Sequence, residues 1–188
     1  MQTLLLNGST LNDEYAQRLL RLVIALFSES GTPPQVINLE ELRIADCTGC
    51  FGCWTRTPGE CAIHDDAPTV TAQMAHAERI VFFCPVVFGG FAPELKRMIE
   101  RSISLLLPFM RVYRGESHHP ARYGRQYELC GIGILTRPDP EAAASFRERL
   151  RRLSLNFNGI LFSAGTLVRG STLDSAQIRE IINVREDV

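Results

Sequence analysis

The sequence lacks several features that would point to particular classes of protein. Its 188 residues carry a formal net charge of only -1, and no dense run of lysine or arginine is present. The chain therefore has no electrostatic footprint for nucleic acid or for an acidic membrane surface. No apolar segment approaches the length of a membrane span, and the N-terminal MQTLLLNGS lacks the basic and apolar parts of a secretion signal. We therefore expect a cytoplasmic protein with no nucleic-acid and no membrane partner.

Signatures of common hydrolytic and nucleotide-binding sites are also missing. No Ser-His-Asp set, no pair of catalytic carboxylates and no Walker-type phosphate loop can be recognised. Internal repeats and low-complexity segments are absent as well. Hydrophobic residues make up 45% and charged residues 22% of the chain, which are proportions typical of a globular protein. The length suits one buried core, so we predict a single domain over residues 1–188.

Apolar segments of strand length alternate with longer segments of helical period. The predicted strands cover residues 3–7, 35–39, 79–84, 127–135 and 159–168, with the third strand ending where Pro85 begins a turn. The predicted helices lie between residues 13 and 31, over 66–77, from Pro93 to about 106, over 139–158 and from 174 to 182. This alternation predicts an α/β fold: a flavodoxin-like, doubly wound, five-stranded parallel sheet in the order 2-1-3-4-5 with helices on both faces.

Charged side chains and loops complete the predicted organisation. In the helix after Pro93, apolar residues recur at helical spacing, and the opposite, solvated face is assigned to Lys96, Arg97, Glu100 and Arg101. Asp65 and Asp66 are expected to cap the helix that follows them. We predict a Cys-rich loop at 47–66 and a loop insertion at about 108–126, in which His118 and His119 are interpreted as solvated.

Two loops follow the first and third strands, where strand order reverses and doubly wound sheets bind ligands. The loop from Asn7 to Asp13 offers a glycine turn, two hydroxyls and a helix start, all of which supply donors to a phosphate. An ordinary capped turn would look the same. The loop from Pro85 to Pro93 places apolar and aromatic groups around a Gly-Gly pair, which lets a flat ring approach the backbone. Such a surface suits an isoalloxazine ring or, alternatively, a subunit contact.

Four of the six cysteines form a compact cluster. Cys47, Cys50 and Cys53 have the spacing C-x2-C-x2-C, and Cys61 follows seven residues later. Four thiolates suit a 4Fe-4S cluster, whereas a structural zinc site usually draws on two separated pairs. In an alternative interpretation the thiols carry no metal and form a folded loop beside the flavin. Cys84 and Cys130 fall within predicted strands and are interpreted as core thiols.

Three motifs taken together resemble the NAD(P)H-dependent FMN reductase and iron-sulfur flavoprotein family of flavodoxin-like proteins. They are NGST, CTGCFGCW followed by TPGEC, and PVVFGGFAPELKRMIER, and they lie in roughly the first hundred residues. Thr10 and Leu11 stand where family members commonly have a Pro-Arg pair. The resemblance implies contacts of the FMN phosphate with Ser9, Thr10 and Asn12. It further implies that the ring is bordered by Pro85, Val86, Phe88, Gly89 and Gly90, with Thr136 near the cofactor.

The resemblance predicts an FMN-dependent NAD(P)H oxidoreductase that passes hydride to flavin N5 and then electrons to a small-molecule acceptor. No side chain is assigned a catalytic role, because the cofactor does the chemistry. Candidate walls of the open ring pocket are Phe88, Phe91, Trp54 and Tyr113. A homodimer or homotetramer is implied. The alternatives are an iron-sulfur flavoprotein acting as an electron carrier, with a cluster on Cys47, Cys50, Cys53 and Cys61 close to the flavin, and a domain that has lost flavin.

Overall fold

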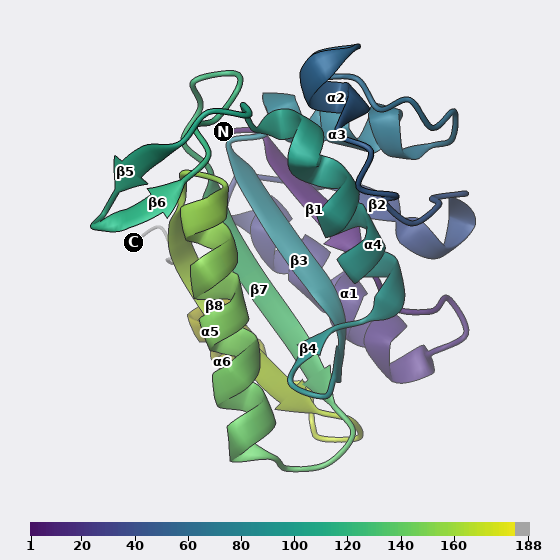
Figure 1. Ribbon diagram of the computed structural model, residues 1–188. Coiled ribbons are helices and arrows are strands. Elements are labelled where there is room, and N and C mark those ends of the chain that lie inside the picture. The colour runs from purple at the N-terminus through teal and green to yellow at the C-terminus, as the bar shows by residue number, and fades with distance from the viewer. Residues whose placement is uncertain (183–188) are drawn as a thin grey trace.

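A parallel sheet with helices on both faces forms the centre of the molecule (Figure 1). The computed structural model describes residues 1–182. The sheet runs in the order β2-β1-β3-β7-β8, which confirms the predicted topology. Its strands are β1 (Thr3–Asn7), β2 (Gln35–Asn38), β3 (Arg79–Val87), β7 (Glu128–Leu135) and β8 (Ile160–Val168). All four pairings along this order are parallel.

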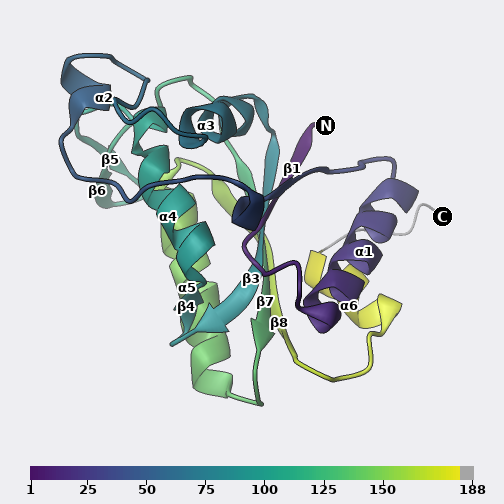
Figure 2. The same ribbon diagram turned by 90° about the vertical axis from the view of Figure 1, so that its right-hand side faces the viewer.

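The helices divide the core into two layers (Figure 2). One face of the sheet is covered by α1 (Glu14–Glu29) and α6 (Ser175–Ile182), and the other by α3 (Ala67–His76), α4 (Pro93–Arg101) and α5 (Pro140–Asn156). Burial on both faces explains why β1 and most of β3 read as continuous apolar runs. The shorter turns are η1 (Leu39–Glu41), α2 (Gly52–Thr55) and η2 (Ser102–Leu105). Within the described residues, none of these helices is long and apolar enough to cross a membrane.

Side-chain caps start two of the long helices. The carboxylate of Asp13 accepts a hydrogen bond from the Ala16 amide at 3.1 Å, and that of Asp139 accepts one from Ala142 at 2.9 Å. Each cap satisfies a backbone donor that has no partner within its helix. Both helices therefore begin where the sequence predicted.

The third strand is longer than predicted. It does not end at Cys84 but continues through Pro85 to Val87, and then turns back into the short strand β4 (Gly90–Phe91). Pro85 lies opposite Ile134, at the last pairing of β3 with β7. A missing N–H is tolerated at the end of a ladder, and the fixed φ of proline is compatible with extended backbone. The predicted turn is therefore a hairpin that projects from the sheet.

The predicted insertion at 108–126 also contains a hairpin, formed by β5 (Arg111–Tyr113) and β6 (Glu116–His118). The prediction that His118 is solvated was wrong, because its side chain is buried between polar partners. Its Nδ1 lies 3.1 Å from Asn156 Oδ1, and its Nε2 lies 3.1 Å from Glu116 Oε2. The end of α5 thus anchors the hairpin, a contact that depends on residues far apart in the sequence.

Candidate functional site

The loops predicted to bind a flavin meet at the carboxyl edge of the sheet, at the bottom of Figure 1. The Gly8 amide donates to the Phe83 carbonyl at 2.8 Å, which ties the first loop to β3. A Cβ atom on Gly8 would lie 2.8 Å from Leu95 Cβ, so only glycine lets the loop pass the start of α4. Thr136 directly follows β7, whose Ile134 pairs with Pro85. The fold therefore brings all three predicted segments to one edge.

The first loop presents donors of two kinds. Ser9 is buried, and both its amide and its hydroxyl donate to Asn7 Oδ1, at 3.0 and 2.6 Å. Thr10 and Asn12 are exposed, and within the described residues their amides have no hydrogen-bond partner. Two of the three predicted phosphate contacts are thus open to a ligand, while the Ser9 hydroxyl is already engaged.

Carboxylates lie next to the open amides. Glu40, in η1, accepts a hydrogen bond from the Leu11 amide. Asp13 caps α1 and forms an ion pair with Arg169 at 2.6 Å. Burial opposes ionisation of Asp13, but Arg169 and the Ala16 amide together hold the pKa of this carboxyl below its usual range. The protein's own anions therefore occupy donors at the helix start where a phosphate would bind.

The second loop is a tight hairpin that holds an aromatic ring in solvent. Phe88 and Gly89 form its corner with φ of +49° and +68°, and the Phe88 side chain is 100% exposed. A Cβ on Gly89 would lie 2.8 Å from the Ser145 side chain, and the Gly89 carbonyl accepts from Arg149 Nε at 3.1 Å. Left-handed backbone costs a non-glycine residue about 1–2 kcal/mol. A strained and exposed phenylalanine indicates a surface for contact with a ligand or a partner.

The cysteine cluster lies at the opposite end of the sheet, near α2 at the top of Figure 1. Helix α4 runs back along β3, so its C-terminal Arg101 reaches the cysteine loop rather than the flavin loops. β3 has nine residues, which places the two ends roughly 30 Å apart at ~3.3 Å per residue. Within the chain the cysteine loop therefore lies apart from the loops predicted to bind flavin, and its place relative to a bound flavin stays a prediction.

All four clustered cysteines line one cavity of about 30 Å³, together with Arg101 and apolar side chains such as Ile63 and Ile103. All are free thiols. Burial and the neighbouring Cys61 raise the pKa of Cys53. A hydrogen bond from the Gly52 amide is the main cause that lowers the pKa of Cys50. Among residues 1–182, no group of three or more Cys, His, Asp or Glu is close enough to hold a metal ion as it stands. The donor set suits a thiolate-bound group, but the sulfurs would have to draw together around it.

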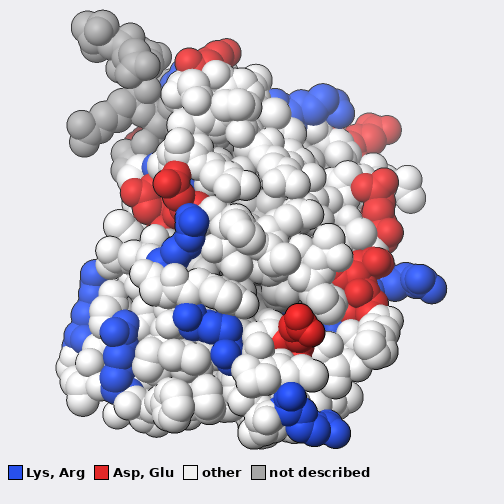
Figure 3. All heavy atoms as spheres, turned by 90° about the horizontal axis from the view of Figure 1, so that it is seen from above, with Lys and Arg blue, Asp and Glu red and all other residues white. Residues whose placement is uncertain are grey.

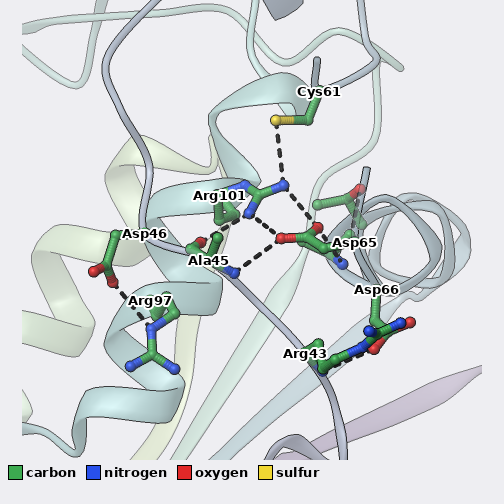
Figure 4. A network of polar contacts seen from close by, with 10 residues as sticks. Arg43, Ala45, Asp46, Cys61, Asp65, Asp66, Arg97 and Arg101 are labelled. Atoms are coloured by element: carbon green, nitrogen blue, oxygen red, sulfur yellow. Dashed lines mark hydrogen bonds and ion pairs between the residues drawn. The ribbon is translucent and has the colours of Figure 1, made fainter. Parts of the chain in front are cut away.

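Arg101 was predicted to lie on a solvated helix face, and this prediction was wrong. Its side chain is fully buried and pairs with Asp65 at 2.6 Å (Figure 4). Arg101 follows Met98 by three residues and precedes Leu105 by four, so it lies on the apolar face of the helical pattern. That spacing is the sequence signal that could have identified it. Arg101 was assigned to the solvated face because it is charged, as its neighbours Lys96, Arg97 and Glu100 are.

Of the two aspartates expected to cap α3, only Asp65 binds an amide at the start of the helix through its side chain. Asp65 Oδ1 accepts from the Ala67 amide at 3.1 Å, whereas Asp66 Oδ2 accepts from the Arg43 amide at 2.7 Å. Burial opposes ionisation of Asp65, but Arg101 and two backbone amides hold its pKa below the usual range. Asp65 thus caps a helix and balances a buried cation at once.

A second cavity, of about 780 Å³, opens between the cysteine loop, the end of α4 and the β5–β6 hairpin. Trp54 lines it, contacts His119 in a tilted ring pair with centroids 4.7 Å apart, and donates through Nε1 to the Ile103 carbonyl at 3.2 Å. Trp54 and Tyr113, two candidate walls of the ring pocket, both lie at the cysteine end, apart from the loops predicted to bind flavin. Phe91 lies near the flavin loops but packs inward against Phe82 and Phe146.

Comparisons with known proteins identify the family of the chain. Residues 1–120 match the sequence profile of the NADPH-dependent FMN reductase family. The chain belongs to this family. The family match covers both loops predicted to bind flavin and the cysteine loop. Figure 3 views the cysteine end from above and shows charges of both signs interleaved with uncharged surface.

Iron-sulfur flavoproteins are among the relatives to which the chain is similar. An iron-sulfur flavoprotein of Methanocaldococcus jannaschii is 29% identical over 109 residues, covering 58% of this chain and 55% of that protein. One from Archaeoglobus fulgidus is 31% identical over 102 residues, covering 54% and 49%. The chain thus spans about half the length of the curated relatives it matches.

Solved structures share the fold along most of the chain. An NAD(P)H:quinone oxidoreductase of Methanothermobacter marburgensis has a TM-score of 0.66 and 12% identity, covering 97% of this chain and 94% of that one. An FMN-dependent NADH-azoreductase of Bacillus anthracis, solved with FMN, has a TM-score of 0.60 and 13% identity, covering 95% and 92%. At such identities the likeness supports the flavodoxin-like fold alone.

The two remaining cysteines lie in the core, as interpreted from the sequence. Burial raises the pKa of Cys84 to about 12 and that of Cys130 to about 11. Neither thiol is exposed to solvent. Both are therefore unreactive packing residues of β3 and β7.

Proposed function

We propose that the protein is an FMN-dependent NAD(P)H oxidoreductase that reduces a small-molecule acceptor. The observation that carries the proposal is the meeting of the β1–α1 loop and the β3–β4 hairpin at the switch point, where the Gly8–Phe83 hydrogen bond holds the first loop against β3. Membership of the NADPH-dependent FMN reductase family supports it. The carboxylates of Asp13 and Glu40 beside the first loop are the feature that fits the phosphate of FMN least well.

The residues at this edge would divide the work of holding FMN. The open amides of Thr10 and Asn12 would bind the phosphate at the start of α1. Ser9 would either leave Asn7 to donate to the phosphate or stay bound to Asn7 and hold the loop in place. Pro85, Val86, Phe88, Gly89, Gly90 and Thr136 would border the ring. FMN, when bound, would accept hydride from NAD(P)H and deliver electrons to the acceptor. The protein binds and orients the reactants and excludes water.

A homodimer or homotetramer would complete this edge. Val87 is 40% exposed and Phe88 fully exposed, next to a ring surface that one chain leaves open. Aromatic residues such as Phe88 are enriched in the centres of interfaces, which are also more apolar than the rest of the surface. We propose that a second copy covers the hairpin and leaves room for nicotinamide and acceptor to stack in turn.

Flavin binding and turnover test the proposal directly. Purified protein should bind added FMN with quenching of its fluorescence, and should oxidise NADH or NADPH in the presence of a quinone. Phe88→Ala should weaken FMN binding, whereas the control Phe109→Ala removes an aromatic ring that is 67% exposed outside the flavin loops and should not. A colourless protein with no affinity for FMN would support the hypothesis of a domain that has lost flavin. Equal loss in both variants would exclude a specific role for Phe88.

A second candidate function is electron transfer through a 4Fe-4S cluster. It is favoured by the convergence of Cys47, Cys50, Cys53 and Cys61 on one cavity, and by the matches to iron-sulfur flavoproteins. Anaerobic purification followed by iron and sulfide analysis tests it. About four irons per chain would support the cluster, whereas flavin without iron would leave a simple flavin reductase with structural cysteines.

A further inference from the structure

We propose that Arg101 is a positioning residue that sets the reduction potential of the thiolate-bound centre at the cysteine cavity. The proposal rests on the second candidate function, a cluster held by the four cysteines. Arg101 hydrogen-bonds one of those sulfurs from a fully buried position, and Asp65 partly offsets its charge (Figure 4). The positive charge of Arg101 and the negative charge of Asp65 therefore shift the reduction potential of the centre in opposite directions.

The guanidinium of Arg101 is bound on almost every side. Nη1 donates to Asp65 Oδ2 at 2.6 Å and to the Ala45 carbonyl at 2.8 Å, and Nη2 donates to Asp65 Oδ1 at 2.9 Å. The other Nη2 contact is with Cys61 Sγ, at 3.3 Å. These contacts use both forks of the planar group and fix its orientation toward the sulfur.

One donor of Arg101 is left without an acceptor. Its Nε is buried and has no hydrogen-bond partner among the described residues, while the residue itself lines the cysteine cavity. A buried donor without a partner costs about 1–3 kcal/mol. Native proteins rarely leave such a group unless a ligand, ion or water satisfies it. A buried cation with a spare donor at a cavity of thiols fits a net negative occupant.

The effect on reduction follows from charge. A thiolate-bound iron-sulfur centre is net negative and gains a further negative charge on reduction. The cavity walls around it are largely apolar, so that charge is poorly screened. A hydrogen bond to a ligating sulfur and a nearby positive charge stabilise the reduced state. Arg101 should therefore raise the midpoint potential, and the carboxylate of Asp65 should lower it.

A neighbouring ion pair supplies a matched control. Arg97 lies one turn earlier on α4 and pairs with Asp46 at 3.0 Å, but the Asp46 side chain is 84% exposed (Figure 4). Solvent screens this pair, and Arg97 does not line the cysteine cavity. Replacing Arg97 changes the net charge of the chain as replacing Arg101 does, without removing a contact to sulfur.

The test uses the full chain, reconstituted anaerobically and titrated with dithionite while electron paramagnetic resonance follows the cluster and absorbance follows the flavin. Relative to the parent, Arg101→Gln should lower the cluster midpoint potential, Asp65→Asn should raise it, and Arg97→Gln should leave it unchanged. The flavin potential, measured in the same samples, should not move. Opposite shifts in the two variants are the electrostatic signature, because general loosening of the loop would not reverse sign.

Other outcomes overturn the proposal in distinguishable ways. Shifts of the same sign in both variants, or none, would overturn the role of Arg101 while leaving the cluster in place. A parent chain that binds flavin but no iron would overturn the cluster and the role of Arg101 together, without touching the flavin function. If Arg101→Gln does not fold, Arg101→Lys and Asp65→Asn decide. Lysine keeps the positive charge but lacks the two Nη groups of the guanidinium, so it should lower the cluster midpoint potential by less than glutamine does. An upward shift of that potential, or none, would contradict the proposal.

Discussion

At the carboxyl end of the sheet, exposed loops hold amides that have no hydrogen-bond partner among residues 1–182, whereas at the amino end the cysteine loop closes around a buried guanidinium. The amides of Thr10 and Asn12 and the ring of Phe88 face solvent at the first end. At the second end, the buried side chain of Arg101 hydrogen-bonds Ala45, Asp65 and Cys61. The first end leaves backbone donors open, and the second is held together by hydrogen bonds and an ion pair within the chain. Substitutions at each end should therefore separate binding from stability.

Removing the buried carboxylate should have the largest effect. Asp65→Ala leaves the Arg101 side chain, 0% exposed, without its counter-ion, which should lower the free energy of unfolding by about 3–5 kcal/mol. Urea unfolding measures the change. Asp46→Ala removes the exposed partner of Arg97 and serves as control, with an expected loss under about 1 kcal/mol. Equal losses would mean that burial of Arg101 does not distinguish the two pairs.

The next effect should come from the glycine that ties the first loop to the sheet. Gly8→Ala drives a Cβ to 2.8 Å from Leu95 Cβ, so backbone must move, with an expected loss of about 1–3 kcal/mol and weaker FMN binding. Gly52→Ala at the cysteine end meets its first neighbour at 3.5 Å and should be tolerated. Thermal unfolding and fluorescence titration measure both quantities. Unchanged FMN affinity in Gly8→Ala would argue against the flavin site at this edge.

A substitution at the hairpin corner should separate stability from binding. Phe88→Gly relieves left-handed backbone and should raise the free energy of unfolding by about 1 kcal/mol, while FMN binding weakens. The same purified samples can be used for urea unfolding and for FMN titration. A variant that is both more stable and equally tight for FMN would show that the strained phenylalanine has no role in the flavin site.

Removing the charge of Glu40 beside the first loop should give a smaller change, a gain in FMN affinity. Glu40→Gln removes the negative charge that the Leu11 amide binds, and should tighten FMN about two- to fivefold while riboflavin, which has no phosphate, is unaffected. Glu41→Gln, in the same turn, is the control, because Glu41 accepts from Asn38 instead. Fluorescence titrations with both flavins measure the ratio. Equal tightening of riboflavin would locate the effect away from the phosphate.

The smallest effect should appear in the acid dependence of stability. The pKa values of Asp13 and Asp65 are held below the ordinary 3.8, so their stabilising contribution is complete above that pH and is lost as the pH falls through the lowered values. Unfolding free energies measured from pH 7 down to pH ~3 should therefore decline at the acid end, less steeply in Asp65→Asn than in the parent. Identical slopes would contradict the coupling of Asp65 to Arg101.

Much of the fold could be predicted because its signals are local. The caps at Asp13 and Asp139 and the apolar runs of β1, β3 and β7 depend on neighbouring residues and on a fixed period. The length of β3 beyond Pro85 and the hairpin at Phe88 could not be predicted in this way. They depend on pairing with β7 and on the clamp from Ser145 and Arg149, which are distant in sequence.

By itself the sequence determined which segments form strands and helices, which loops follow the strands and where the four cysteines stand, because strand period, helix caps and residue spacing act over short stretches of chain. Only the tertiary structure decided where these parts lie relative to one another. The return of α4 along β3 carries Arg101 to the cysteines and separates them from the flavin loops by the length of the sheet. Burial of Arg101 was likewise decided there, since a charge enters a core only where a distant carboxylate, Asp65, meets it.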